Sequence, residues 1–240
     1  MKKVLVISFV LILGNVSAQN YDFAQYKRLN NLAHKTDSLG EFSSAIVYYD
    51  SMLNTIDFYP YDYFNAFSTA WKFGDSLKAN DYLVQGALKG FDISGWYGEE
   101  IDEFSSREIG RKYLGIKDSL ISEHFKSIDK DYYDELERLV ARDQSIRDGG
   151  SEMLYNDSLN FETLIELSEQ KGFPTFPLTG YGCNNATLLL WHHRGSEFPV
   201  SDQWKRIIPL INLDIKRGNL DPNFLQMHED FNEKNGYNNK

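Results

Sequence analysis

The side chains best suited to chemistry fall within residues 136–193. On a helix of about 3.6 residues per turn, Asp143 and Arg147 lie on one stripe with three apolar residues, Leu136, Leu139 and Val140. An acid and a base on a buried face need partners, because an unpaired buried charge costs several kcal/mol. We therefore expect Asp143 and Arg147 either to form an ion pair or to belong to a functional site.

A later apolar segment brings a histidine to a comparable position. Its buried face follows the spacing i, i+3, i+4, i+7 and predicts that His193 points inward and His192 elsewhere, since that face comprises Ala186, Leu189, Leu190 and His193. We expect Asp143, Arg147 and His193 to converge on a pocket. Gln144, His192 and Asp230 are further candidates for ligand binding.

The chemistry of such a pocket follows from the residue types. Arg147 would hold a carboxylate or a phosphate through its planar guanidinium. His193 would act as a general base, oriented by Asp143 or Asp230. This hypothesis describes an enzyme or a binder of small ligands. Because the protein is expected to be exported, a hydrolase is the default class of enzyme.

A structural interpretation of the same residues stays open. Phe173-Pro174 and Phe176-Pro177 favour an extended crossing between Gly172 and Gly180. The backbone N–H and C=O groups of such a crossing need partners. Asp143 and Arg147 would then be an ion pair that bonds the crossing, and His193 would be a core residue.

Other chemistries have less support in the sequence. His192 and His193 are adjacent, hence about 100° apart on a helix, whereas two zinc ligands on one helix face need i, i+4 spacing. The chain has no glycine-rich phosphate loop and no Gly-x-Ser-x-Gly turn. We expect neither a metal nor a cofactor. Cys183, the one cysteine, is expected to be a small buried residue rather than a nucleophile.

The N-terminus predicts export. Lys2-Lys3, an apolar run from Val4 to Leu13, and Val16-Ser17-Ala18 are typical of a secretory signal over residues 1–18, with cleavage after Ala18. The apolar run is too short to span a bilayer comfortably. We expect a periplasmic or secreted bacterial protein with no stable membrane insertion after cleavage.

The charge of the chain bounds its partners. The formal net charge is −10, and loss of Lys2 and Lys3 with the signal makes the mature chain more acidic. A general binder of nucleic acid or of anionic membranes needs a basic surface. Nucleic acid is therefore not an expected partner.

Residues 19–129 carry an internal repeat. Gly40 and Gly74 are 34 residues apart, as are Ala45 and Ala79. This period, with a glycine turn and a small residue where two helices approach, resembles tetratricopeptide repeats. The resemblance implies two helical hairpins, Leu29 to Met52 and Tyr63 to Leu88.

Two units of this kind cannot cover both of their faces, because a solenoid needs about three repeats. We expect helices over Ile101–Tyr113 and Ser119–Ile128 to cap them.

Residues 130–240 predict a second, irregular helical domain. Its expected helices are Tyr132–Arg147, one capped by Asn160 and closed by Gly172, one from Gly180–Asn185 to His193, one from Ser201 or Asp202 with a kink at Pro209, and one from Asp221-Pro222 to about Lys234. Alternating strand patterns are almost absent. The sequence therefore predicts an all-α fold.

The order of signals over residues 135–236 resembles an uncharacterised bacterial domain family with Asp-Gln-x-x-Arg, Gly-Trp-Pro and Gln-His motifs. The chain matches it at Asp143, Gln144, Arg147, Gly172, Pro174, Gly180 and His193. Phe173 replaces the Trp, His192 the Gln, and Phe231 the Arg of an Asp-Arg pair begun by Asp230. The closing Gln-x-Tyr-Gly segment is missing. The resemblance implies no established reaction.

Two functional classes follow. The first, which we favour, is a helical protein-interaction module whose repeat half presents a groove to a peptide or to another envelope or secreted protein. The second is an enzyme or small-ligand binder that uses Asp143, Arg147 and His193. An accessible cleft around His193 would favour the second class.

Overall fold

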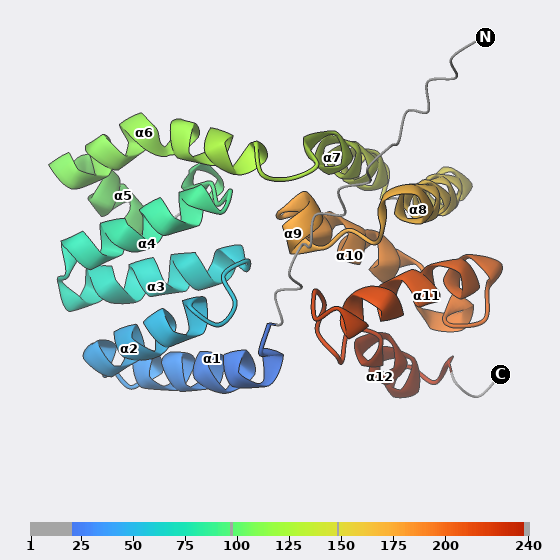
Figure 1. Cartoon of the computed structure of the whole chain (residues 1–240), viewed down its shortest axis with the longest axis horizontal. Helices are drawn as coiled ribbons and strands as arrows, with labels where there is room; N and C mark the ends of the chain where they lie inside the picture. The colour runs from blue at the N-terminus through green and yellow to red at the C-terminus, as the bar shows by residue number, and fades with distance from the viewer. Residues whose placement is uncertain (1–20, 97, 148, 238–240) are drawn as a thin grey trace, which may run out of the picture.

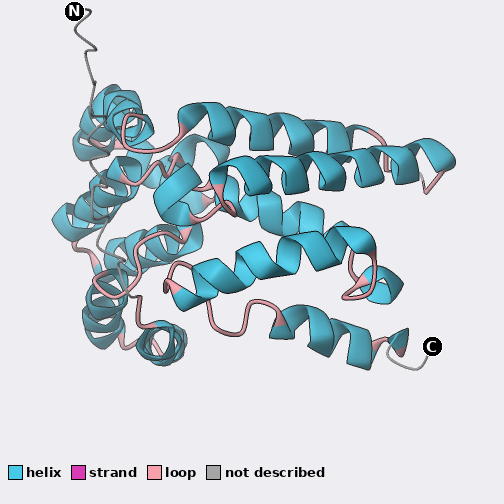
Figure 2. Ribbon diagram, turned by 45° about the vertical axis from the view of Figure 1, so that its right-hand side comes forward, coloured by secondary structure: helices cyan, strands magenta, loops and turns pink. Residues whose placement is uncertain are grey.

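In the computed structural model, residues 21–96, 98–147 and 149–237 are described, and this part of the chain is all α, with no strand (Figures 1 and 2). The prediction of an all-α fold is confirmed. The predicted signal over residues 1–18 lies outside the described residues. Among the described helices, none has the length and apolar character needed to cross a membrane.

The first half of the molecule is a stack of helices whose first four members pack in chain order (Figure 1). Its members are α1 (Phe23–Ser38), α2 (Phe42–Leu53), α3 (Pro60–Phe73), α4 (Ser76–Leu88), α5 (Glu99–Ser106) and α6 (Glu108–Phe125). Gly40 and Gly74 make the turns between paired helices with φ of +73° and +89°, a region that glycine enters without steric cost. The small residues Ala45 and Ala79 are fully buried where those helices meet.

The capping helices lie where expected but differ in their bounds. α6 packs on α4, and α5 packs on α3. The break falls at Arg107, with extended backbone, and α6 begins at Glu108 rather than Ser119. Gly110 accounts for the break, because a Cβ there would collide with the carbonyl oxygen of Phe104.

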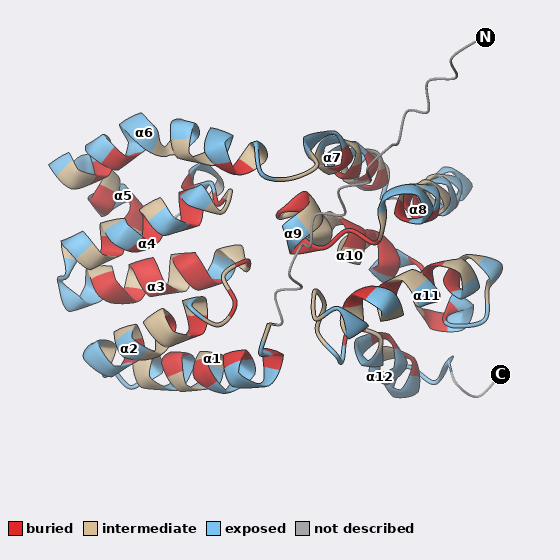
Figure 3. Ribbon diagram, viewed as in Figure 1, coloured by how far each residue is buried: buried red, intermediate tan, exposed pale blue. Residues whose placement is uncertain are grey.

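The second half builds its own apolar cluster (Figure 3). Its helices are α7 (Lys130–Ser145), α8 (Ser151–Lys171), α9 (Phe176–Thr179), α10 (Gly182–His192), α11 (Asp202–Lys216) and α12 (Gln226–Lys234). α10 packs against both α7 and α8, and α11 packs on α8. Ser201 caps α11 by accepting from the backbone N–H of Trp204, and Pro209 lies inside that helix.

Several expected helix limits in this half are wrong. α8 begins at Ser151, and Asn160 is a buried residue inside it rather than its cap. Arg147 lies beyond α7, because Ile146 already has extended backbone. α12 begins at Gln226 rather than at Pro222.

The crossing from Gly172 to Gly180 is only partly extended. Pro177 lies in the first turn of α9, where proline fits because its missing N–H has no helical partner in any case. The carbonyl of Leu178 accepts from the backbone N–H of Asp129, and the carbonyl of Gly172 accepts from the hydroxyl of Tyr132. The expectation that Asp143 and Arg147 bond this crossing is wrong.

Phe176 joins the two halves. Although it belongs to α9, it is buried in the apolar cluster of the first half. Its ring stacks on Phe58 with centroids 5.0 Å apart and on His124 at 5.9 Å. Gly180 makes room for this contact, because a Cβ there would lie 2.5 Å from Nε2 of His124.

A second buried histidine gives the fold a dependence on pH. His228 is 1% exposed among Phe198, Trp204 and Phe224, and neither ring nitrogen has a hydrogen-bond partner among the described residues. Burial, and then the charge of Arg194, lower its pKa from 6.5 to about 4. Between these values the unfolded chain binds the extra proton, so stability falls as the pH falls, by about 1.4 kcal/mol per pH unit.

We predict that His228→Phe flattens this decline. Urea unfolding of both proteins at pH 7 and pH 5 measures it. The variant should match the wild type within about 1 kcal/mol at pH 7, because replacing an unpaired polar ring by an apolar one is nearly neutral, and should exceed it at pH 5. Equal slopes of stability against pH would contradict the assignment.

Candidate functional site

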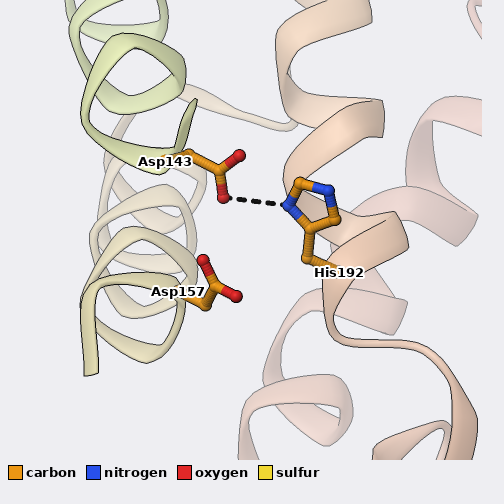
Figure 4. A group of neighbouring side chains, drawn as sticks. All are labelled: Asp143, Asp157 and His192. Carbon is orange, nitrogen blue, oxygen red and sulfur yellow. Dashed lines mark hydrogen bonds and ion pairs between the residues drawn. The ribbon is translucent and has the colours of Figure 1, made fainter. Parts of the chain in front are cut away.

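Three helix ends bring a polar cluster together in the second half. Asp143 lies in the last turn of α7, Asp157 in α8, and His192 is the last residue of α10. Their side chains point toward one another, and a hydrogen bond joins His192 to Asp143 (Figure 4). The fourth member, Arg147, comes from the short segment after α7. We call these four residues the polar cluster.

Arg147 neutralises the carboxylates of the cluster. It forms an ion pair with Asp143, whose side chain is fully buried. Its Nη1 lies 3.1 and 3.2 Å from the two carboxylate oxygens of Asp157. The predicted ion pair of Asp143 and Arg147 is therefore present, with a second acid attached.

The two carboxyl groups titrate differently. Burial by itself would raise the pKa of Asp143, but hydrogen bonds from Arg147 and His192 outweigh it and hold the pKa below its usual range. Burial raises the pKa of Asp157, and the charge of Asp143 adds to this against the opposing effect of Arg147. Two neighbouring carboxyl groups whose pKa values move apart can serve as acid and base, although both are engaged by Arg147.

The histidine of the cluster is His192, which lies off the buried stripe of α10 as expected, whereas the expectation that His193 joins Asp143 and Arg147 is wrong. Its Nδ1 lies 2.9 Å from Oδ1 of Asp143 and 2.9 Å from Nη2 of Arg147. Protonated, Nδ1 donates to Asp143; unprotonated, it accepts from Arg147. Nε2 has no hydrogen-bond partner among the described residues.

His193 is buried, as its place on the α10 stripe predicted, but it does not join the cluster. Nε2 donates to the backbone carbonyl of Asp157 at 2.7 Å, and Nδ1 lies 3.0 Å from the carboxylate of Glu197. Its ring stacks on Phe161 with centroids 4.5 Å apart. His193 is the C-terminal cap of α10, one residue beyond the helix, which turns its ring toward α8 instead of α7.

Of the other residues proposed from the sequence, one borders the polar cluster and the others do not. Gln144 donates its side-chain amide to Asp143 at 2.5 Å and so borders the cluster. Asp230 accepts from Gln226 on the exposed face of α12 and has no contact with the cluster. Burial raises the pKa of the Cys183 thiol to about 12, which disfavours the thiolate that a nucleophile needs.

Asp157 was missed because residues 151–159 were expected to lie outside a helix. The signal was present: Asp157 precedes Phe161 by four residues and Leu164 by seven, which continues the buried stripe of α8 toward its start. A polar residue on an apolar stripe is the same pattern that identified Asp143.

The cluster offers three potential metal ligands. One ligand atom each of Asp143, Asp157 and His192 lie within 4.8 Å of one another. The guanidinium of Arg147 contacts all three residues. A divalent cation bound to them would have to displace this guanidinium, so the arrangement fits an arginine rather than a metal.

A second candidate site is a groove between the halves. One chamber of about 490 Å³ and another of about 300 Å³ share four lining residues, Tyr59, Asn184, Thr187 and Trp191. Asn184, Thr187 and Trp191 follow i, i+3, i+7 spacing, so one face of α10 forms a wall. The opposite wall comes from α1 and α3 of the first half. We call this the inter-half groove.

A buried acid lines the larger chamber. Asp62, in the first turn of α3, is 3% exposed. The hydroxyl of Tyr26 donates to its Oδ2 at 2.8 Å, and this is its one side-chain partner among the described residues. Burial raises its pKa to about 7, against the opposing hydrogen bond from Tyr26. A buried carboxyl with a raised pKa at a cavity wall is a candidate functional group.

No family model, curated protein or solved structure matches the chain. The resemblances to tetratricopeptide repeats and to the bacterial domain family therefore stay predictions. The polar cluster and the inter-half groove are the two features of the structure that bear on function.

We predict that Arg147→Ala costs roughly 3 kcal/mol of stability, because it leaves the buried Asp143 without its ion-pair partner. Chemical denaturation measures the loss. Arg107→Ala is the matched control, since Arg107 pairs with Glu103 at the surface with both side chains more than half exposed, and should cost under about 1 kcal/mol. Equal losses would place Arg147 in an exposed pair.

We predict that Asp62→Asn stabilises the protein in alkaline solution. The pKa of Asp62 is raised in the folded state from 3.8 to about 7, so its contribution is fully present below about pH 4 and lost as the pH rises through 7. Asparagine keeps an acceptor for Tyr26 and carries no charge. The variant should gain roughly 1 to 4 kcal/mol at pH 8, measured by urea unfolding.

The comparison at pH 4 is the control for Asp62→Asn, because the wild-type carboxyl is protonated there and the two proteins should differ little. A variant that is less stable than the wild type at pH 8 would show that the fold itself supplies a counter-charge to Asp62.

Proposed function

We propose that this protein is a helical protein-interaction module that holds an extended segment of another polypeptide in the inter-half groove. The observation that carries the proposal is the groove itself, two joined chambers with walls from both halves of the chain. The polar cluster supports it indirectly, because its charges are engaged with one another and hold α7, α8 and α10 in place.

The groove carries the side chains that polypeptide recognition uses. Tyr61 and Trp191 at its walls are 67% and 43% exposed. Large exposed aromatic side chains are typical of the residues that dominate binding energy at interfaces. A partner that covers them removes apolar surface from water.

Amide side chains give the groove a means of holding a peptide backbone. Asn30, Asn65 and Asn184 line the larger chamber. Each amide can donate to a carbonyl and accept from an N–H, the two groups that an extended segment presents along its length. Among the described residues, Asn65 has no side-chain hydrogen bond, so its amide is available to a ligand.

The predicted compartment narrows the class of partner. With a signal over residues 1–18, the protein would meet other exported polypeptides, so we propose a partner in the envelope or outside the cell. The 34-residue period of the first half is consistent with a repeat that presents an inner face to a peptide.

A second candidate function rests on His192. Asp143 orients its ring from Nδ1, and Nε2 has no hydrogen-bond partner in the described part of the chain, as a general base requires. A hydrolase or small-ligand binder at this position would need Arg147 to release its carboxylates or to hold a ligand while still paired. His192→Gln, which keeps hydrogen-bonding groups on the same helix, would abolish such an activity but leave polypeptide binding unchanged.

We predict that blocking the groove abolishes partner capture. Immobilised mature wild type, Thr187→Trp and Trp191→Ala are incubated with the exported proteins of the source cells, and bound proteins are identified by mass spectrometry. Thr187→Trp fills the space that both chambers share. A polypeptide held in the groove should bind the wild type and neither variant.

Leu77→Ala is the matched control, since Leu77 is 75% exposed on α4 and does not line either chamber. It should capture the same polypeptide as the wild type. Capture that survives both groove variants and fails with Leu77→Ala would move the interaction to the outer surface of the helical stack.

A further inference from the structure

We propose that the inter-half groove selects a segment that carries a lysine or arginine, whose charged group pairs with Asp62 in the larger chamber. This inference rests on the proposed function, because it specifies the chemistry of the polypeptide that the groove holds.

The larger chamber carries an acidic side chain but no lysine or arginine. That side chain is Asp62. The other acid of the groove, Asp221, lies in the smaller chamber and is paired with Lys27 at 2.6 Å. Asp62 is thus the acid in the groove without a cationic partner among the described residues.

The carboxylate of Asp62 has few hydrogen bonds for a buried acid. Its one side-chain bond comes from Tyr26, which itself accepts from the amide of Asn30 at 3.1 Å. The start of α3 favours a negative charge at this place, but no backbone N–H among the described residues donates to the carboxylate. A buried carboxylate needs charge pairing or several hydrogen bonds, and a cation in the chamber supplies the missing interaction.

Aromatic side chains surround Asp62 in the larger chamber. The rings of Tyr26 and Tyr59 lie 5.3 Å apart beside Asp62. Tyr61 and Trp191 stand exposed on the lining of the same chamber. Aromatic faces attract ammonium and guanidinium groups and cover the aliphatic stem of a lysine or arginine. A carboxylate at the end of an aromatic chamber therefore matches both parts of a basic side chain.

The charge of the chamber and of the whole chain disfavours an acidic partner. An acidic or phosphorylated segment would meet Asp62 in a chamber that His34 lines but no lysine or arginine does. The whole chain carries a formal net charge of −10, which attracts a basic segment from a distance and repels an acidic one.

The test uses a display library of random twelve-residue peptides selected on the mature wild-type protein. Peptides that bind are then measured by calorimetry against the wild type, Asp62→Asn and Trp191→Ala. Each is also resynthesised with every lysine or arginine replaced in turn by methionine, which keeps an unbranched apolar stem and removes the charge.

We expect the selected peptides to share one basic position. Its replacement by methionine should weaken binding to the wild type at least tenfold. The same replacement should change binding to Asp62→Asn less than threefold, because the partner charge is already absent. Trp191→Ala should weaken all of the peptides.

Two results overturn the inference in different ways. Peptides that depend on Trp191 but bind Asp62→Asn as well as the wild type would leave the groove as a peptide site and remove the basic-residue selectivity. Failure to select any peptide that depends on Trp191 or Asp62 would overturn the proposed function as well.

A small cation is the remaining outcome. Butylamine, arginine and choline are tested by thermal shift at millimolar concentration on the wild type and on Asp62→Asn. A shift that Asp62→Asn abolishes, without any peptide selected, would make the chamber a small-cation site and overturn the assignment to a polypeptide.

Discussion

The insertion of Phe176 into the first half is the contact on which the arrangement of this molecule depends. α9 is a single turn, yet it places that ring against Phe58 and His124, in an apolar cluster that otherwise belongs to α1–α6. The contact needs a glycine at position 180 and an uncharged His124, whose pKa is lowered by burial and then by Lys89. With this anchor in place, α10 faces α1 and α3 across a space that becomes the inter-half groove.

The two groups of buried acids show opposite solutions to the same electrostatic problem. Asp143 and Asp157 are buried beside the partly exposed Arg147, whose guanidinium pairs with both carboxylates. Asp62 is also buried, but among the residues that the structure describes its carboxylate accepts one hydrogen bond, from the neutral hydroxyl of Tyr26. An acid kept buried at some cost to stability, at the wall of a chamber, supports the binding role that we propose for the inter-half groove.

Much of the local structure could be read from spacing. The glycine and alanine positions 34 residues apart predicted the turns and the close helix contacts of the first half, because those positions are set by backbone conformation and side-chain size. The buried stripe of α7 predicted that Asp143 is inside and paired with Arg147. The start of α8 was missed because most of residues 151–159 are exposed, Leu154 and Tyr155 among them, so Asp157 alone continues the buried stripe there.

The sequence by itself determined the helical class and the need of Asp143 for a partner, since both follow from residue type and helical period. The tertiary structure alone decided which histidine meets that acid. Adjacent residues on a helix point about 100° apart, so His192 meets Asp143 whereas His193 packs on Phe161, and the packing of α10 against α7 and α8 decides which of them does so. The tertiary structure also decided that Asp62 lines a chamber completed by α10, because these two faces are distant in the chain and meet through tertiary packing that includes the insertion of Phe176.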